Sequence, residues 1–137
     1  MSEPTIVDTS IWIDVLRDGG GSRVGRLRAL VDPEDVVLTR FTQLELLQGA
    51  RDERQWELLD RYLADQEYVA GGEEAFARAA RIYFELRRAG RTVRSPIDCC
   101  IAQIALEHEL PLLHRDRDFT AIGELRPSLR QSWLSWS

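Results

Sequence analysis

The chain contains 137 residues, of which 44% are apolar and 30% are charged, a balance typical of one folded globular domain and not of a disordered chain. Acidic residues outnumber basic ones by 23 to 18, and the net charge of −5 argues against a protein that binds nucleic acid non-specifically. The longest stretch without an acidic or basic residue, residues 99–106, has eight positions, whereas a membrane-spanning helix needs about 20 apolar residues. We therefore expect a single cytoplasmic domain over residues 1–137, with neither a signal peptide nor a membrane segment.

All 18 basic residues are arginines, because the sequence contains no lysine. This excludes a Walker-type phosphate-binding loop, Schiff-base catalysis and the lysine-dependent chemistry of protein kinases. Cys99 and Cys100 are adjacent in an apolar, helix-like run, so they point to different faces of a helix and cannot form a zinc site by themselves. We expect both cysteines to be small core residues.

The first part of the chain predicts two strands, each followed by helix. The β-branched residues 5–7 are expected to form a strand that ends at Asp8. Ser10 then caps a helix that stops at a run of three glycines, and Ser22 opens another. Residues 36–38 form the second strand, and Thr42 opens the helix that follows it.

The rest of the chain continues this alternation. A long helix precedes a short strand candidate at residues 68–69, and an amphipathic helix covers residues 73–88. Ser95 and Pro96 open the next helix. Residues 112–114 form the last clear strand, a short helix follows, and no element is assigned to the tail. Strands separated by helices predict an α/β domain with a mainly parallel sheet.

Four acidic residues occupy related places in this pattern. Asp8 follows the first strand, and Asp116 lies two residues beyond the last clear strand. Glu45 and Asp98 lie in the first turns of predicted helices. Open α/β sheets bind ligands at the carboxyl ends of their strands, so the sheet would bring the four carboxylates into one crevice.

Each acid also has a purely structural interpretation. Residues 42–45 and 95–98 both fit the capping-box spacing, in which the acidic residue bonds back to the start of its helix. Asp8 could form a turn that leaves a strand, and Asp116 could cap a helix. Together, however, the acids would repel one another unless a hard cation such as Mg²⁺ or Mn²⁺ held them. An oxygen-only cluster of this kind indicates metal-dependent phosphodiester chemistry.

The segments that carry these acids resemble the motifs of the PIN-domain ribonucleases, and within them the VapC toxins of bacterial toxin–antitoxin pairs. The resemblance covers nearly the whole chain, and the motifs keep the family's order and spacing. The four segments are Ile-Val-Asp-Thr-Ser at 6–10 followed by Trp12, Thr-Gln-Leu-Glu-Leu-Leu-Gln-Gly-Ala at 42–50, Ser-Pro-Ile-Asp-Cys-Cys-Ile-Ala at 95–102 and Leu-Leu-His-Arg-Asp-Arg-Asp-Phe at 112–119.

The resemblance implies a three-layer α/β/α sandwich with a mainly parallel central sheet. It also implies a toxic Mg²⁺-dependent endoribonuclease, with Mn²⁺ as an alternative metal, that hydrolyses RNA such as tRNA or rRNA. A small cognate antitoxin is the implied partner, and we expect a homodimer. Cleavage by this family's chemistry would leave a 5′-phosphate and a 3′-hydroxyl.

Matched by motif, the implied catalytic and metal-binding residues are Asp8, Glu45, Asp98 and Asp116. Asp8, Asp98 and Asp116 would ligate the principal metal, and Glu45 would hold that metal or a second one, or orient the attacking water.

Further residues near these acids remain candidates. Asp118 is an additional candidate for the acidic cluster, and an ion pair with Arg115 is its alternative. Ser10 is a candidate for orienting Asp8, with helix capping as its alternative. The arginines nearest the acids in sequence are candidate contacts to RNA phosphates: Arg91, Arg94, Arg115 and Arg117.

Rival functions fit less well. A receiver-type phosphotransfer domain needs a late lysine, and a haloacid-dehalogenase-type phosphatase needs an acid two residues after its first Asp, where this chain has Ser10. Two alternatives stay open: a catalytically silent PIN-like domain that binds RNA or protein, and a DNA nuclease with the same metal site.

Overall fold

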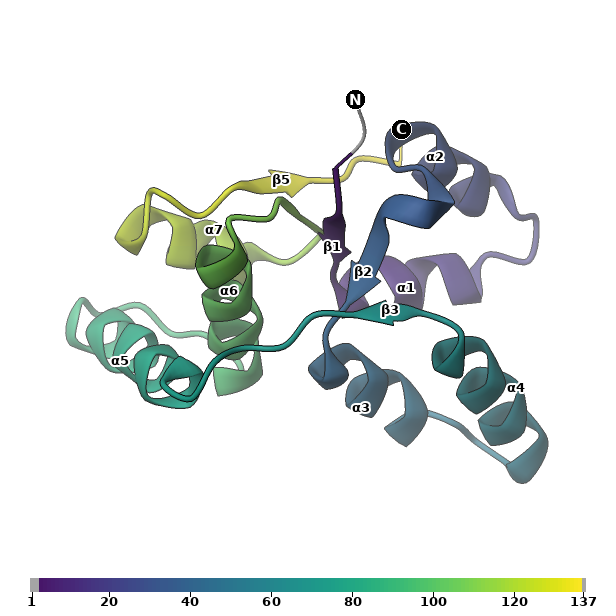
Figure 1. Cartoon of the computed structure of the whole chain (residues 1–137), viewed down its shortest axis with the longest axis horizontal. Helices are drawn as coiled ribbons and strands as arrows, with labels where there is room; N and C mark the ends of the chain where they lie inside the picture. The colour runs from purple at the N-terminus through teal and green to yellow at the C-terminus, as the bar shows by residue number, and fades with distance from the viewer. Residues whose placement is uncertain (1–2, 137) are drawn as a thin grey trace.

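The structure, a computed structural model, describes residues 3–136. Its five short strands form one sheet in the order β3-β2-β1-β4-β5, and every neighbouring pair is parallel (Figure 1). The strands are β1 (Thr5–Val7), β2 (Val36–Leu38), β3 (Glu67–Tyr68), β4 (Leu112–His114) and β5 (Gln131–Trp133). Because all of them run the same way, their carboxyl ends meet at one edge of the sheet.

Helices connect the strands and cover the sheet. Within the described range they are α1 (Thr9–Arg17), α2 (Ser22–Leu30), the 3₁₀ turn η1 (Pro33–Asp35), α3 (Arg40–Gln48), α4 (Glu53–Ala64), α5 (Ala75–Arg88), α6 (Pro96–His108) and α7 (Arg117–Leu125). None of these helices is long and apolar enough to cross a membrane.

The core consists of two hydrophobic clusters, one on each face of the sheet. Ile6 and Leu112 join the cluster that contains the buried residues of α5, α6 and α7. Their neighbours Val7 and Leu113 point to the other face, where α1 to α4 supply the core. This alternation is the two-residue period of a strand. The predicted α/β/α sandwich with a parallel sheet is therefore confirmed.

The helices that lead into the site begin earlier than the sequence suggested. Asp8, not Ser10, is the N-cap of α1, and its side chain accepts a hydrogen bond from the Ser10 N–H. In α3 the cap is Thr39, which accepts from the Thr42 N–H at 3.4 Å. Thr42 therefore lies inside the helix that it was expected to open. Threonine is a good cap at either position, so local sequence alone does not separate the two starts.

The tail that sequence analysis left unassigned forms the edge strand β5. The Leu112 N–H donates to the Arg130 carbonyl at 2.7 Å, and the Leu134 N–H donates to the His114 carbonyl at 2.8 Å. Residues 131–133 show no apolar alternation, which explains why the pattern did not reveal this strand. Beyond it, the Trp136 indole N–H donates to Asp14 at 2.9 Å, which attaches the tail to α1.

Candidate active site

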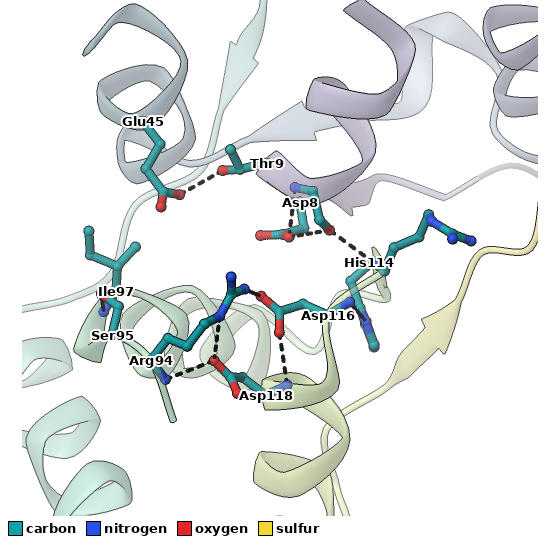
Figure 2. Close-up of polar contacts among 11 residues, drawn as sticks. Asp8, Thr9, Glu45, Arg94, Ser95, Ile97, His114, Asp116 and Asp118 are labelled. Carbon is teal, nitrogen blue, oxygen red and sulfur yellow. Dashed lines mark hydrogen bonds and ion pairs between the residues drawn. The ribbon is translucent and has the colours of Figure 1, made fainter. Parts of the chain in front are cut away.

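A cleft of about 400 Å³ opens at the carboxyl edge of the sheet, where the ends of β1 and β4 meet the middle of α3 and the first turn of α6 (Figure 2). All four acids predicted from the motifs line it: Asp8, Glu45, Asp98 and Asp116. The structure thus brings together carboxylates that are up to 108 positions apart in the chain, as the parallel topology requires.

Asp8 lies directly after the central strand β1 and is only 3% exposed. One of its oxygens, Oδ2, accepts hydrogen bonds from the Ser10 N–H at 3.0 Å and the Ser10 hydroxyl at 2.6 Å. The other, Oδ1, is buried without a hydrogen-bond partner among the described residues. Burial raises the pKa of the Asp8 carboxyl, and the nearby Asp116 raises it further, against the bonds from Ser10.

The Ser10 side chain connects the end of β1 with the end of β4. While its hydroxyl donates to Asp8, its oxygen accepts from the Arg115 N–H at 3.0 Å, just beyond β4. The interpretation of Ser10 as the helix cap is therefore wrong, because Asp8 holds that position. The geometry suits the other candidate role, a hydroxyl that orients Asp8.

Asp98, Asp116 and Asp118 form the tightest part of the acidic cluster. One oxygen of each lies within 4.8 Å of an oxygen of the other two. Asp116 is also the N-cap of α7, and its Oδ1 accepts from the Asp118 N–H at 2.9 Å. Burial, together with the charges of Asp116 and Asp8, raises the pKa of Asp98 to about 9. Without a cation, the charged form of the Asp98 carboxyl is therefore disfavoured.

Glu45 reaches the cleft from the middle of α3. Its Oε1 accepts a hydrogen bond from the Thr9 hydroxyl at 2.7 Å, and the buried Thr42 hydroxyl lies 3.0 Å from that of Thr9. Burial raises the pKa of Glu45, although the bond from Thr9 opposes this shift. The capping-box interpretation of residues 42–45 is wrong, because α3 begins at Arg40.

The capping-box interpretation of residues 95–98 is only partly correct. Ser95 does cap α6, but its hydroxyl accepts from the Ile97 N–H at 3.1 Å and not from that of Asp98. Asp98 instead lies inside the cluster, where one of its oxygens is within 4.8 Å of an oxygen of Asp118. Capping therefore does not account for the position of the Asp98 carboxylate.

The four candidate arginines have different surroundings. Arg94 pairs with Asp116 at 2.5 Å, whereas Arg91 pairs with Glu124 outside the acidic cluster. Arg117 is exposed in the first turn of α7.

Arg115 pairs with Asp14 at 3.0 Å and donates to the Leu134 carbonyl. The alternative ion pair between Arg115 and Asp118 is therefore wrong. Asp14 lines the cleft on α1 and was missed by sequence reasoning. Its place one turn after Ser10 on the same helix face was the available signal.

His114, the last residue of β4, forms a hydrogen bond with the Asp116 backbone. The buried ring accepts at Nδ1 from the Asp116 N–H at 3.1 Å, and Nε2 lies 2.6 Å from Gln131 Oε1. These contacts require a neutral ring with its proton on Nε2, and burial lowers the pKa of His114 accordingly. These contacts give His114 a structural role at this edge of the sheet.

The donor set of the cleft fits a hard divalent cation. It offers carboxylate oxygens with no thiol or imidazole among the lining residues, and Asp8 Oδ1 is a buried acceptor that lacks a hydrogen-bond partner within the described part of the chain. Burying a carboxylate oxygen without a partner is costly, and a bound cation would remove that cost.

Comparison with known proteins decides the family. The PIN domain family model matches residues 5–125. Ribonuclease VapC11 from Mycobacterium tuberculosis is 33% identical to this chain over 123 residues, which cover 88% of this chain and 92% of the relative. The chain belongs to the PIN-domain family, in its VapC branch.

Solved structures share the PIN fold. A chain of the DNA-bound VapBC complex from Salmonella typhimurium matches with a TM-score of 0.75 and 21% identity, over 98% of this chain and 99% of that chain. A chain of VapBC-5 from Mycobacterium tuberculosis matches with a TM-score of 0.64 and 26% identity, over 96% and 97%. The fold and the family expected from the four PIN motifs are both confirmed.

Proposed function

We propose that this chain is the toxin of a VapC-type toxin–antitoxin pair and that it hydrolyses RNA phosphodiester bonds with Mg²⁺ or Mn²⁺. The observation that carries this proposal is the acidic cleft, which carboxylates from all four motif segments line and in which one buried Asp8 oxygen has no hydrogen-bond partner among residues 3–136. The relatives named as ribonucleases support it. The packing of both hydrophobic clusters on one sheet supports residues 1–137 acting as one PIN domain, which we place in the cytoplasm with its RNA substrate.

In this proposal each acidic side chain has a defined task. Asp8, Asp98 and Asp116 hold the metal, with Asp118 beside them, and Glu45 holds a metal or orients the attacking water. The Thr9 hydroxyl fixes the direction of the Glu45 carboxylate, and Ser10 fixes that of Asp8. When bound, the cation lowers the pKa of a water molecule and offsets the negative charge that develops on the phosphate.

The arginines divide between two tasks. Arg91, Arg94 and Arg117 are exposed, Arg94 lines the cleft, and all three would contact the phosphates of RNA. Arg115 would serve mainly to connect Asp14 on α1 with the tail, because its guanidinium already bonds to both.

The test is RNA cleavage by the purified protein with and without chelator. Cleavage of total RNA is expected to fall to background in excess EDTA and to return with added Mg²⁺ or Mn²⁺, because in this proposal the cation activates the attacking water. Sequencing the product ends would identify the cut sites and check for a 5′-phosphate and a 3′-hydroxyl. Activity that survives thorough chelation would refute the metal mechanism, and faster cleavage of single-stranded DNA in a parallel reaction would favour the DNA nuclease.

A second surface suits the antitoxin that we propose as the partner. A mainly apolar groove of about 760 Å³ lies between α1, α2 and α4, and α1 separates it from the acidic cleft. Leu58, on its wall, is 56% exposed. One structural relative is described as a toxin–antitoxin complex from Klebsiella pneumoniae, and another as a member of the VapBC family of toxin–antitoxin systems. We propose that an amphipathic antitoxin segment fills this groove and approaches the cleft across α1, on each subunit of a homodimer.

Replacing Leu58 with Glu is expected to weaken antitoxin binding about 10- to 100-fold, because burying one leucine contributes about 1.5–3 kcal/mol. The measurement is titration with the product of the adjacent reading frame. Phe76→Glu is the matched control, since Phe76 is 68% exposed on α5, across the sheet from the groove. An equal loss of antitoxin affinity in both variants would mean that the antitoxin does not bind in this groove.

A further inference from the structure

Arg94 enters the acidic cluster from the loop between α5 and α6 (Figure 2). Its Nη2 lies 2.5 Å from Asp116 Oδ2, and its Nε lies 3.6 Å from Asp118 Oδ2. The backbone N–H of Arg94 donates to that same Asp118 oxygen at 3.0 Å. Among the ion pairs of residues 3–136, those of Arg94 are the ones that reach these two acids.

The two ends of this ion pair differ greatly in burial. The Asp116 side chain is 9% exposed, whereas the Arg94 side chain is 78% exposed. The carboxylate is therefore fixed by the fold, while the guanidinium reaches it from solvent with little packing around it. Moving the arginine away would expose little new apolar surface and break few contacts.

The guanidinium also occupies the oxygen that a cation would need. Asp116 Oδ1 already accepts the Asp118 N–H, so Oδ2 has more lone-pair capacity for a ligand. Arg94 takes that oxygen. A divalent cation held by Asp98, Asp116 and Asp118 would lie within a few ångströms of the guanidinium, and two positive groups this close repel.

We propose that Arg94 is an internal counter-ion: its guanidinium neutralises the cluster in the metal-free protein and is displaced when the cation binds. This rests on the proposed metal-dependent function. Displacement leaves a mobile arginine at the mouth of the cleft, next to where an RNA phosphate would lie. Because the cation must displace Arg94, its affinity is lower than the carboxylates alone would give. When an RNA phosphate binds the displaced guanidinium, RNA strengthens metal binding by the same factor as the metal strengthens RNA binding.

The test is calorimetric titration of the full chain with Mg²⁺, and with Mn²⁺ in a parallel series, in the absence of RNA. Arg94→Met keeps the length of the side chain and removes its charge. It is expected to bind the cation about 1.5- to 5-fold more tightly than the wild type, the range that corresponds to one exposed ion pair. Arg94→Lys keeps the charge and is expected to stay close to the wild type.

Arg91→Met is the matched control, because Arg91 lies in the same loop but pairs with Glu124. Its metal affinity should equal that of the wild type. Thermal melting gives a second readout: Arg94→Met should melt lower than the wild type in EDTA and at the same temperature in saturating Mg²⁺. A residue that only supports the fold would lower both melting temperatures equally.

Unchanged or weaker metal binding by Arg94→Met, with RNA cleavage by the wild type intact, would overturn the role of Arg94 and leave the proposed function standing. If neither the wild type nor the variant binds Mg²⁺ or Mn²⁺, both proposals fail. If Arg94→Met binds the cation and the wild type does not, the result would directly support the role of Arg94 as a counter-ion.

Discussion

Neutralising any one of the four acids that line the cleft is expected to reduce RNA cleavage by at least about 100-fold. The substitutions are Asp8→Asn, Glu45→Gln, Asp98→Asn and Asp116→Asn. Each keeps the shape of the side chain and removes a charged oxygen ligand. A loss of about 3 kcal/mol of transition-state stabilisation, within the several kcal/mol that a bound metal supplies, corresponds to slightly more than two orders of magnitude. The measurement is the initial rate of cleavage, with circular dichroism to verify the fold.

Asp52→Asn is the matched control for these variants. Asp52 is also a helix N-cap, and it accepts from the Gln55 N–H at 2.8 Å, but it lies at the start of α4, away from the cleft. Asparagine caps a helix as well as aspartate does, so its activity should equal that of the wild type. Near-normal cleavage by Glu45→Gln or Asp98→Asn would remove that residue from the catalytic set.

The metal-free protein should become more stable when Asp8 is replaced by Asn. The Asn side chain can still cap α1 and accept from Ser10, while the charge that burial and Asp116 disfavour is gone. A gain of about 1 kcal/mol would raise the melting temperature by roughly 3–5 °C for a domain of this size. Saturating Mg²⁺ should stabilise the wild type more than Asp8→Asn, because only the wild type has the full ligand set.

The same melting experiment has a pH dependence with a definite sign. Burial raises the pKa values of Asp8, Glu45 and Asp98 above those of the unfolded chain, so the folded metal-free state binds more protons. Stability is therefore greatest below about pH 4 with respect to these groups, and it is lost as the pH rises toward the folded pKa of Asp98, about 9. In EDTA the wild type should melt lower at about pH 8 than at about pH 5, and Mg²⁺ should reduce the difference.

Two results would contradict this account. Asp8→Asn could be less stable than the wild type in EDTA and equally stabilised by Mg²⁺, which would make Asp8 a helix cap and no more. The melting temperature of the metal-free wild type could rise between about pH 5 and about pH 8, which would mean that the carboxylates do not oppose folding in their charged forms.

Local pattern and motif resemblance together predicted most of the fold and the acidic cleft. The three clear strands were readable because β-branched and leucine runs stand between helical segments, and the parallel topology then placed their carboxyl ends together. The helix starts were less certain. Thr39 and Thr42 are both good caps in sequence, and tertiary packing selects the first.

Contacts between distant segments could not be predicted in the same way. Arg94 reaches Asp116 only because the loop before α6 folds over the end of β4. The pairing of Arg115 with Asp14, and not with Asp118, depends on where α1 lies beside the sheet. Strand β5 is held by backbone hydrogen bonds to β4, which side-chain patterning does not reveal.

The position of β1 at the centre of the sheet has a consequence for how the protein is made. β1 is synthesised first, but its partner β4 follows about 100 residues later, which takes roughly 5–20 s at the usual rate of translation. Until then Asp8 has neither Asp98 nor Asp116 beside it. The growing chain therefore cannot assemble the acidic cleft before β4 and Asp116 have been synthesised, and an RNA-cutting enzyme built in this order stays inactive until then.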